Sequence, residues 1–347
     1  MSGHGLGGFI ATRLNCRGEQ DPHTHARAVA AAIGPLLADP PDLLIVQGDT
    51  SSALGGALAA VEANVPLAHV EAGLRSFDRS MPWPEEDNRI AIDAVADILF
   101  APTETSAANL RSECLGGIIH VTGNTGIDAL LATLAKLPMA ASARSGNEVP
   151  LILVTCHRRE NWGAGLTSVA LALIEIARSA RVRIDCVLHP NPALRQSMHS
   201  LLDGVANIRL IEPYHHRAMI AAMREAALIL SDSGGVQEEA PALGIPLLVL
   251  REKTERPEGV VSGNMVLVGT DTARIVDTVT RLLSDPKSLT EMGRPALPFG
   301  DGHSGPRIAA HILDWIEGRR ADLLAAADLT SSRPTDIWPA RPHGPFV

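Results

Sequence analysis

Aromatic residues are scarce in this sequence: its 347 residues include four Trp, one Tyr and five Phe, or 3%. The hydrophobic content is nevertheless 46%, so we expect cores built mainly from Ala, Leu, Ile and Val. With 20% charged residues, the composition is typical of a soluble globular protein. The length suggests two domains, each large enough to bury a sizeable core.

Cysteine motifs and long apolar runs are also lacking. No CxxC pair and no spacing typical of metal ligands occurs among the four cysteines, which are Cys16, Cys114, Cys156 and Cys186. Because no signal peptide is recognisable either, we expect reduced thiols in a cytoplasmic protein. No apolar run approaches the roughly 20 residues that cross a membrane, so we expect no membrane partner.

Positive charge is in deficit. The chain has 30 Lys and Arg against 39 Asp and Glu, which gives a formal net charge of −9. This balance argues against nucleic acid or an anionic membrane surface as a partner.

What the sequence does contain is most informative between Ala226 and Gly259. A strand-length apolar run ends in Ser233-Gly234-Gly235, and a helix is expected to follow as far as Leu243, with Gly244 as its stop. Glycines at a helix start let the backbone approach a ligand, and free N–H groups there attract phosphate. Glu238 and Glu239 follow one turn later, and only one of them is expected to face the ligand, where it could bind a ribose. Taken alone, the stretch also fits an ordinary βα turn.

Carboxylates follow the strands of the first half. Asp49 comes after the apolar run Leu43–Val46, and Glu71 comes after the next one, Val65–Val70. In parallel sheets the carboxyl ends of strands meet at one edge, which is where ligands bind. Asp49 taken alone is better explained as a helix N-cap, and Glu85 as an acid favoured by the dipole of the helix that it begins.

The second half restarts at Leu151 and places positive charge at its strand ends. Its first strand opens onto His157-Arg158-Arg159, and a later one ends at His189. A histidine beside two arginines is suited to binding an anion, although a structural role is about as probable on this evidence. The chain therefore predicts two α/β halves facing a cleft, with acids on one side and an anion site on the other. This arrangement suits a nucleotide-diphosphate sugar.

We expect residues 1–143 to form the first Rossmann-like domain and residues 150–302 the second, joined by the polar linker Ser142–Pro150. The glycines of Met1–Gly8 have no preceding strand and indicate a flexible start. Residues 303–318 are expected to form a closing helix that packs back on the first domain. Residues 319–347 lack a sustained apolar period, which predicts a disordered tail.

Seven motifs resemble the non-hydrolysing UDP-N-acetylglucosamine 2-epimerases, in the order of that family. They are Gln47–Thr50, His69–Arg75, Pro82–Glu86, Thr122–Thr125, His157–Glu160, Ser233–Pro241 and Thr254–Glu258. The resemblance covers residues 42–315 and implies a glycosyltransferase-B-like architecture. It further implies reversible interconversion of UDP-N-acetylglucosamine and UDP-N-acetylmannosamine, for polysaccharide precursor supply, without NAD or a required metal, by a cytoplasmic homodimer.

The resemblance also implies roles for individual residues. The catalytic positions would be Asp49, Glu71, Glu85 and His157. The UDP-binding positions would be Ser233, Gly234, Gly235, Glu239 and Arg256. The sequence does not settle which carboxylate acts on which face of the sugar.

One departure from the family is expected to matter. The family begins with a strand and a Gly-Thr-Arg-Pro-Glu loop that have no counterpart here, and a misplaced start codon would explain this. The first sheet is then expected to have an exposed edge. Three other functions stay open: a glycosyltransferase of the same architecture, a hydrolysing epimerase, and a catalytically impaired sugar-nucleotide-binding protein.

Overall fold

The computed structural model describes residues 12–138 and 149–331. The expected flexible start and most of the expected linker lie outside the described residues, as does the end of the chain from residue 332. The chain divides into two compact units, and the boundary lies between Gly305 and Pro306. Both sheets belong to the first unit.

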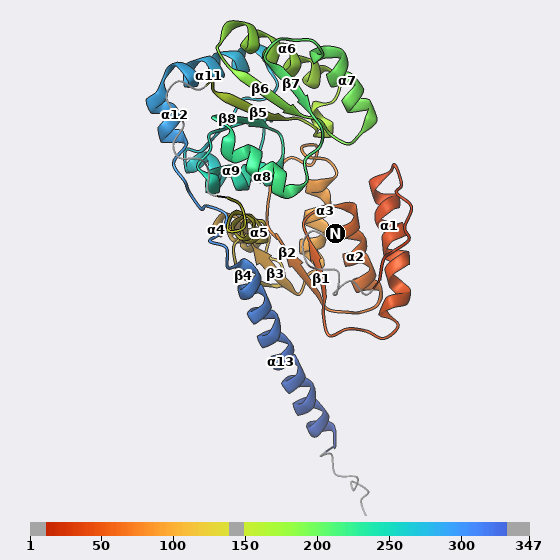
Figure 1. The fold of residues 1–347 in the computed structure, drawn as a ribbon. Coiled ribbons are helices and arrows are strands. Elements are labelled where there is room, and N and C mark those ends of the chain that lie inside the picture. The colour runs from red at the N-terminus through yellow and green to blue at the C-terminus, as the bar shows by residue number, and fades with distance from the viewer. Residues whose placement is uncertain (1–11, 139–148, 332–347) are drawn as a thin grey trace, which may run out of the picture. The chain divides into compact units, whose positions relative to one another are not determined.

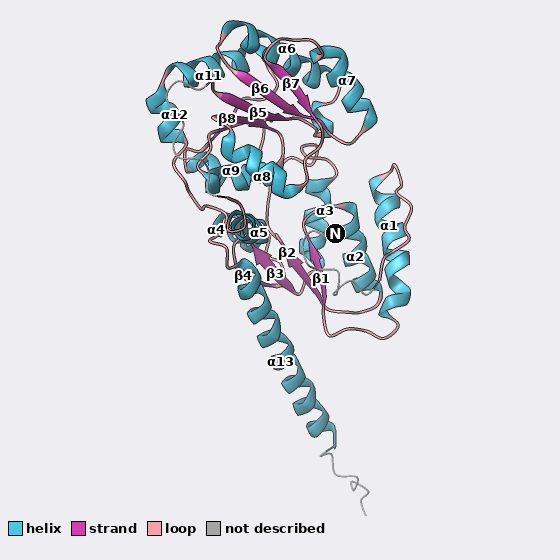
Figure 2. Ribbon diagram, in the orientation of Figure 1, coloured by secondary structure: helices cyan, strands magenta, loops and turns pink. Residues whose placement is uncertain are grey.

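The first sheet is parallel and follows chain order, β1-β2-β3-β4 (Figures 1 and 2). Its strands are β1 (Leu44–Gln47), β2 (Leu67–Val70), β3 (Ile98–Ala101) and β4 (Ile118–Val121). The two central strands are buried along their whole length, as parallel strands covered on both faces must be. β1 is an edge strand among the described residues, and the side chain of Ile45 on it is 51% exposed.

Small residues allow the helices of this half to pack closely. A Cβ added to Gly55 would lie 2.6 Å from the carbonyl oxygen of Ala26, so glycine is required where α1 and α2 meet. Thr50 begins α2 by accepting the Ala53 N–H at 3.2 Å. The helices are α1 (Pro22–Ile33), α2 (Ser51–Glu62), α3 (Glu85–Val95), α4 (Glu104–Ser112) and α5 (Thr125–Leu134), with the 3₁₀ turn η2 (Gly34–Leu37).

The second sheet has six parallel strands in the order β10-β9-β8-β5-β6-β7. The order reverses beside β5, which is the kind of switch point where open α/β sheets bind ligands. The strands are β5 (Leu151–Thr155), β6 (Arg183–Val187), β7 (Ile208–Ile211), β8 (Leu228–Ser231), β9 (Leu247–Val249) and β10 (Met265–Leu267).

Alternate side chains of β5 pack into two different hydrophobic cores. Ile152 and Val154 pack with residues of α6, α7 and α11, whereas Leu153 packs with residues of α8 and α9 (Figure 1). This alternation follows from the two-residue period of a strand. The helices are α6 (Ala164–Ser179), α7 (Pro192–Leu202), α8 (His216–Glu225), α9 (Gly234–Leu243), α10 (Pro257–Val261), α11 (Thr272–Ser284) and α12 (Pro286–Met292), with the 3₁₀ turn η3 (Arg159–Asn161).

The expected α/β class and the two parallel sheets are confirmed. Gly244 ends α9 with φ of 66°, the left-handed conformation that a glycine stop provides. All four cysteines are free thiols, as expected. No helix in the described part of the chain is both long and apolar enough to cross a membrane.

The last helix differs from the expectation. Helix α13 (Ser304–Ser331) begins where the side chain of Asp128 accepts the N–H groups of Ser304 and Gly305, at 3.0 and 2.7 Å. It continues past Arg319 as far as Ser331, where we expected no helix, and disorder of the tail stays a prediction. The helix continues because this segment is rich in Ala, Leu and Arg, whose helix propensity is high even without an apolar period. The packing of residues 303–318 on the first domain stays a prediction.

Candidate active site

The loops after β1 and β2 bring two of the predicted acids to one edge of the first sheet. Gly48 has φ of 70°, and a Cβ on it would lie 3.3 Å from Glu71 Oε2. Glu71 itself has φ of 73°, a conformation that residues other than glycine rarely adopt. Such strained backbone at a strand tip is a frequent sign of a functional side chain.

Asp49 does not cap helix α2, because Thr50 does. Its carboxylate instead accepts Nη2 of the buried Arg89 at 2.5 Å, and its backbone carbonyl accepts Asn88 Nδ2 at 2.8 Å. The side chain of Asp49 is therefore held towards the sheet edge by helix α3. The interpretation of Asp49 as an N-cap is wrong.

Arg256 connects Glu71 to the second half. Its Nη2 donates to Glu71 Oε1 at 3.0 Å, and its Nε donates to Glu238 Oε1 at 2.7 Å. Its Nη1 donates to Glu255. Asn124 contributes a further bond to Glu71 Oε1, at 3.3 Å. One buried guanidinium thus holds three carboxylates, two of them from the second half.

The pKa values of the three carboxylates around Arg256 are shifted in different directions. Burial raises the pKa of Glu238 to about 7, although Arg256 opposes the shift. Burial also raises the pKa of Glu71, with Arg256 opposing and the charge of Asp49 adding to the rise. For Glu255, burial is outweighed by Arg256 and Arg251, so its pKa lies well below the usual range. Burial and neighbouring charges thus move the pKa values of acids of one type in opposite directions.

His157 and Arg158 follow β5 and are fixed through their backbone. Both of their N–H groups donate to Asp232 Oδ2, each at 2.8 Å. Burial lowers the pKa of His157, although the charge of Asp232 opposes the shift. Burial thus favours the neutral form of the His157 imidazole.

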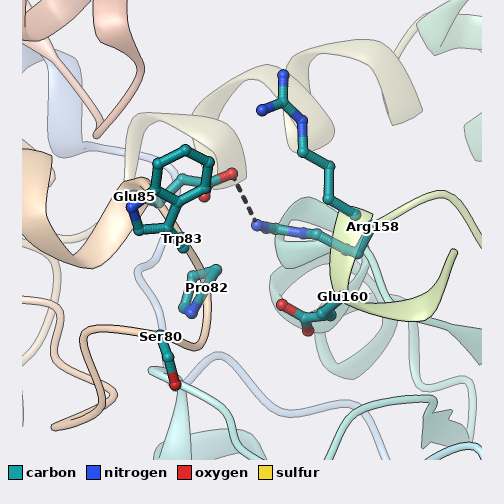
Figure 3. A pocket seen from close by; sticks show the side chains of 7 residues that line it. Ser80, Pro82, Trp83, Glu85, Arg158 and Glu160 are labelled. Carbon is teal, nitrogen blue, oxygen red and sulfur yellow. Dashed lines mark hydrogen bonds and ion pairs between the residues drawn. The ribbon is translucent and has the colours of Figure 1, made fainter. Parts of the chain in front are cut away.

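A cavity of about 230 Å³ lies where Glu85 meets Arg158 (Figure 3). Glu85 Oε1 accepts Arg158 Nη1 at 3.3 Å, while Glu85 Oε2 is buried and has no hydrogen-bond partner among the described residues. Figure 3 shows the side chains of Glu85 and Arg158 facing one another across this space. The lining comes from both halves: Ser80, Pro82, Trp83, Glu85, Arg158, Arg159 and Glu160.

The start of helix α9 has the features of an anion site. Ser233 occupies the N-cap position, and its side chain makes no cap hydrogen bond. A Cβ on Gly234 would lie 2.9 Å from Arg256 Nη1, so the guanidinium rests directly against this glycine. A Cβ on Gly235 would meet no atom within 4 Å, so the space beside it is open. Helix N–H groups, a cation and open space together suit a diphosphate.

Glu238 and Glu239 point to different partners, as their adjacency on a helix predicts. Glu238 is buried against Arg256, whereas Glu239 Oε1 lies 3.1 Å from His216 Nε2. The side chain of Glu239 is 14% exposed, and burial raises its pKa with His216 opposing the shift. A carboxylate held by histidine at the edge of the site is available to a ribose.

The structure groups the predicted residues in three places. Asp49 and Glu71 share one sheet edge with Arg256, Glu85 lies with Arg158 beside the cavity, and Glu239 lies apart with His216. Sequence reasoning missed four partners that hold these side chains. Their signal was weak, since each is an ordinary polar residue outside the predicted site: Arg89, His216, Asp232 and Glu255.

Comparison with known proteins bears directly on this arrangement. The family model described as UDP-N-acetylglucosamine 2-epimerase matches residues 6–313. The UDP-N-acetylglucosamine 2-epimerase of Escherichia coli K12 is 43% identical over 307 residues, which cover 85% of this chain and 81% of the relative. The chain belongs to the UDP-N-acetylglucosamine 2-epimerase family.

Solved structures of the family agree. The UDP-GlcNAc 2-epimerase of Neisseria meningitidis, whose crystal structure has UDP-GlcNAc bound, superposes with a TM-score of 0.82 and 37% identity over 86% of this chain and 84% of that one. A sucrose-phosphate synthase of Thermosynechococcus elongatus is 16% identical with a TM-score of 0.56, covering 91% and 82% of the two chains, and shares only the fold. The architecture is glycosyltransferase-B-like, and the chain is an enzyme of the epimerase family.

Proposed function

We propose that this enzyme interconverts UDP-N-acetylglucosamine and UDP-N-acetylmannosamine through elimination and re-addition of UDP. The C2 proton leaves to a base while the C1–O bond breaks on the opposite face, giving 2-acetamidoglucal and UDP. The reverse addition delivers a proton to the other face of C2. The observation that carries the proposal is the sharing of Arg256 by Glu71 and Glu238, next to Gly234.

Proton transfer is assigned to the acids of the first half. A carboxylate works best as acid or base when its pKa lies near the working pH, and burial moves Glu71 in that direction. Asp49 and Glu85 are the other two candidates. Glu85 has one buried oxygen without a hydrogen-bond partner among the described residues, which leaves it able to accept a proton.

The departing diphosphate requires positive charge and N–H donors. We assign these to the start of helix α9 at Ser233, Gly234 and Gly235, with His157 beside them. Arg256 lies against Gly234, and its charge is already shared among three carboxylates. As a direct nucleotide contact Arg256 therefore stays a prediction, and its role as the link between Glu71 and the second half has the stronger support.

The nucleotide is assigned to the second half, with Glu239 on the ribose hydroxyls. We further propose that the enzyme works as a homodimer in the cytoplasm and needs neither NAD nor a metal. Light scattering on the purified protein tests the dimer, and activity in the presence of a chelator tests the metal.

Incubation with UDP-N-acetylglucosamine in D₂O, followed by NMR at C2, tests the reaction. We expect UDP-N-acetylmannosamine to appear and deuterium to enter C2 of both epimers. Release of free N-acetylmannosamine would assign a hydrolysing epimerase instead. Binding of UDP-N-acetylglucosamine without any exchange at C2 would leave a sugar-nucleotide-binding protein.

A further inference from the structure

Asp232 lies at the end of β8, directly before the anion site of helix α9. It is completely buried. One of its oxygens, Oδ2, accepts three hydrogen bonds, from His157 N and Arg158 N at 2.8 Å and from Asn161 Nδ2 at 3.0 Å. This oxygen ties the end of β5 to the end of β8, which is an anchoring role.

The other oxygen of Asp232 has no such role. Oδ1 is buried and has no hydrogen-bond partner among the described residues, and His157 Nδ1 lies 3.4 Å from it. A buried carboxylate oxygen without a donor is energetically unfavourable. A small rotation of the imidazole would satisfy it. Distances of this kind shorten when a ligand closes the site.

Two further contacts hold His157, one at its imidazole and one at its backbone. Its ring stacks on that of His189, with centroids 5.2 Å apart and planes 11° from parallel. The N–H of Asn191 donates to His189 Nδ1 at 3.1 Å, which holds the second ring in place. The backbone carbonyl of His157 accepts Trp162 Nε1 at 2.9 Å. The stacked His189 thus confines the ring of His157.

We propose that Asp232 is the positioning residue for His157: it keeps the proton on Nδ1 and leaves Nε2 as the ring nitrogen available to the substrate. The inference rests on the proposed function, in which His157 acts beside the departing diphosphate. With Nδ1–H directed to a fixed carboxylate, Nε2 is the single site of proton gain or loss. When Nε2 is protonated, the negative charge of Asp232 balances the imidazolium.

The near-isosteric variant Asp232→Asn tests the roles of the two Asp232 oxygens separately. Its amide oxygen can occupy the Oδ2 position and keep the three anchoring bonds. Its NH₂ group then faces His157 Nδ1 and must donate to it, so the histidine proton moves to Nε2. The same change in a catalytic Asp–His pair of a protease lowers kcat by about 10⁴ through the wrong tautomer. Here we expect kcat to fall by at least about 100-fold, with UDP affinity changed by less than about threefold.

Nitrogen-15 NMR of histidine-labelled protein reads the tautomer directly, with His157→Gln identifying the signal. We expect His157 to be protonated on Nδ1 in the unmodified enzyme and on Nε2 in Asp232→Asn. Asn161→Ala is the matched control, because it removes a bond to Oδ2 and leaves Oδ1 alone. It should lower the melting temperature without moving the proton of His157.

The wild-type spectrum tests the inference even if the Asp232→Asn variant does not fold. An Nε2-protonated His157 in the unmodified enzyme overturns the inference whatever the variants do. Near-normal kcat in folded Asp232→Asn overturns it as well. Because the tautomer is measured without substrate, this test does not depend on whether the proposed function is correct. A chain without C2 exchange but with the predicted tautomers would retain the Asp232–His157 relationship and reject only the epimerisation.

Discussion

Arg256 Nη2 and Glu71 Oε1 lie 3.0 Å apart, although their residues are 185 positions apart in the chain. The same guanidinium donates to Glu238 at 2.7 Å. A change in the charge of Glu71 therefore alters the field at Glu238, and the reverse holds as well. This coupling makes the protonation of Glu71 depend on a residue of the second half.

Replacing Glu71 by Gln should abolish epimerisation and leave UDP affinity within a few-fold. The amide keeps the shape and can still accept from Arg256, but it cannot carry the C2 proton. Loss of a general base lowers rates by roughly 10²–10⁴-fold. Glu104→Gln is the control, since that carboxylate is exposed and pairs loosely with Arg111 at 3.4 Å. Turnover by Glu71→Gln close to that of the control would remove Glu71 from the mechanism.

Glu238→Gln should alter the pH dependence of stability. The pKa of Glu238 is about 7 in the folded protein and about 4.5 when unfolded, so between these values the folded state binds a proton that the unfolded state does not. Glu238 therefore makes the wild type less stable as pH rises from about 4.5 to about 7. Gln does not ionise, so the variant should gain on the wild type by on the order of 1–3 kcal/mol between pH 5 and pH 8.

Urea unfolding at the two pH values measures this difference. Glu212→Gln serves as the control, because Arg195 lowers the pKa of Glu212 and its contribution to stability changes little between pH 5 and pH 8. A gap between Glu238→Gln and wild type that is the same at both pH values would show that Glu238 is ionised throughout.

The strands, and the placement of Asp49 and Glu71 at one sheet edge, could be predicted from the sequence for a local reason. Buried parallel strands are short apolar runs, and the polar residues after them, such as Asp49 and Glu71, must reach one sheet edge. Gly244 was predictable as a helix stop by the same kind of local chemistry. Each of these features depends on a few consecutive residues.

The partners of the site residues were not predictable, because they depend on packing between distant segments. Nothing near Arg256 in the chain indicates that Glu71 lies beside it. Asp49 was assigned to a cap because local hydrogen bonds favour that position for Asp, yet Thr50 caps the helix and Arg89 holds the acid. Helix α13 likewise continues beyond Arg319 because its residues have high helix propensity. The apolar period alone had predicted disorder there.

Glu239→Ala should weaken UDP binding by about 1.5–3 kcal/mol, the scale of a hydrogen bond to a charged group. The fold should persist, because the side chain of Glu239 is bonded to the side chain of His216 at the surface of the site and not to the core. His216→Gln, which can still donate to the carboxylate, should have a much smaller effect. Calorimetry with UDP measures both, and an unchanged affinity in Glu239→Ala would place the ribose elsewhere.

Gly234→Ala and Gly235→Ala should fail in different ways. A Cβ on Gly234 would lie 2.9 Å from Arg256 Nη1, and that guanidinium cannot move aside without leaving Glu71, Glu238 or Glu255. We expect Gly234→Ala to lose about 1–3 kcal/mol of unfolding free energy, the usual cost of overpacking, and to lose activity with it.

Gly235 has open space beside it, so Gly235→Ala should fold with wild-type or slightly higher stability, since Ala is the better helix former by up to about 1 kcal/mol. Its methyl group would occupy the space that we assign to the diphosphate, so UDP affinity should fall about tenfold or more. Urea unfolding and calorimetry on both variants separate the effects. Wild-type UDP affinity in Gly235→Ala would move the diphosphate away from helix α9, and wild-type stability in Gly234→Ala would show that the three carboxylates do not hold Arg256 against the glycine.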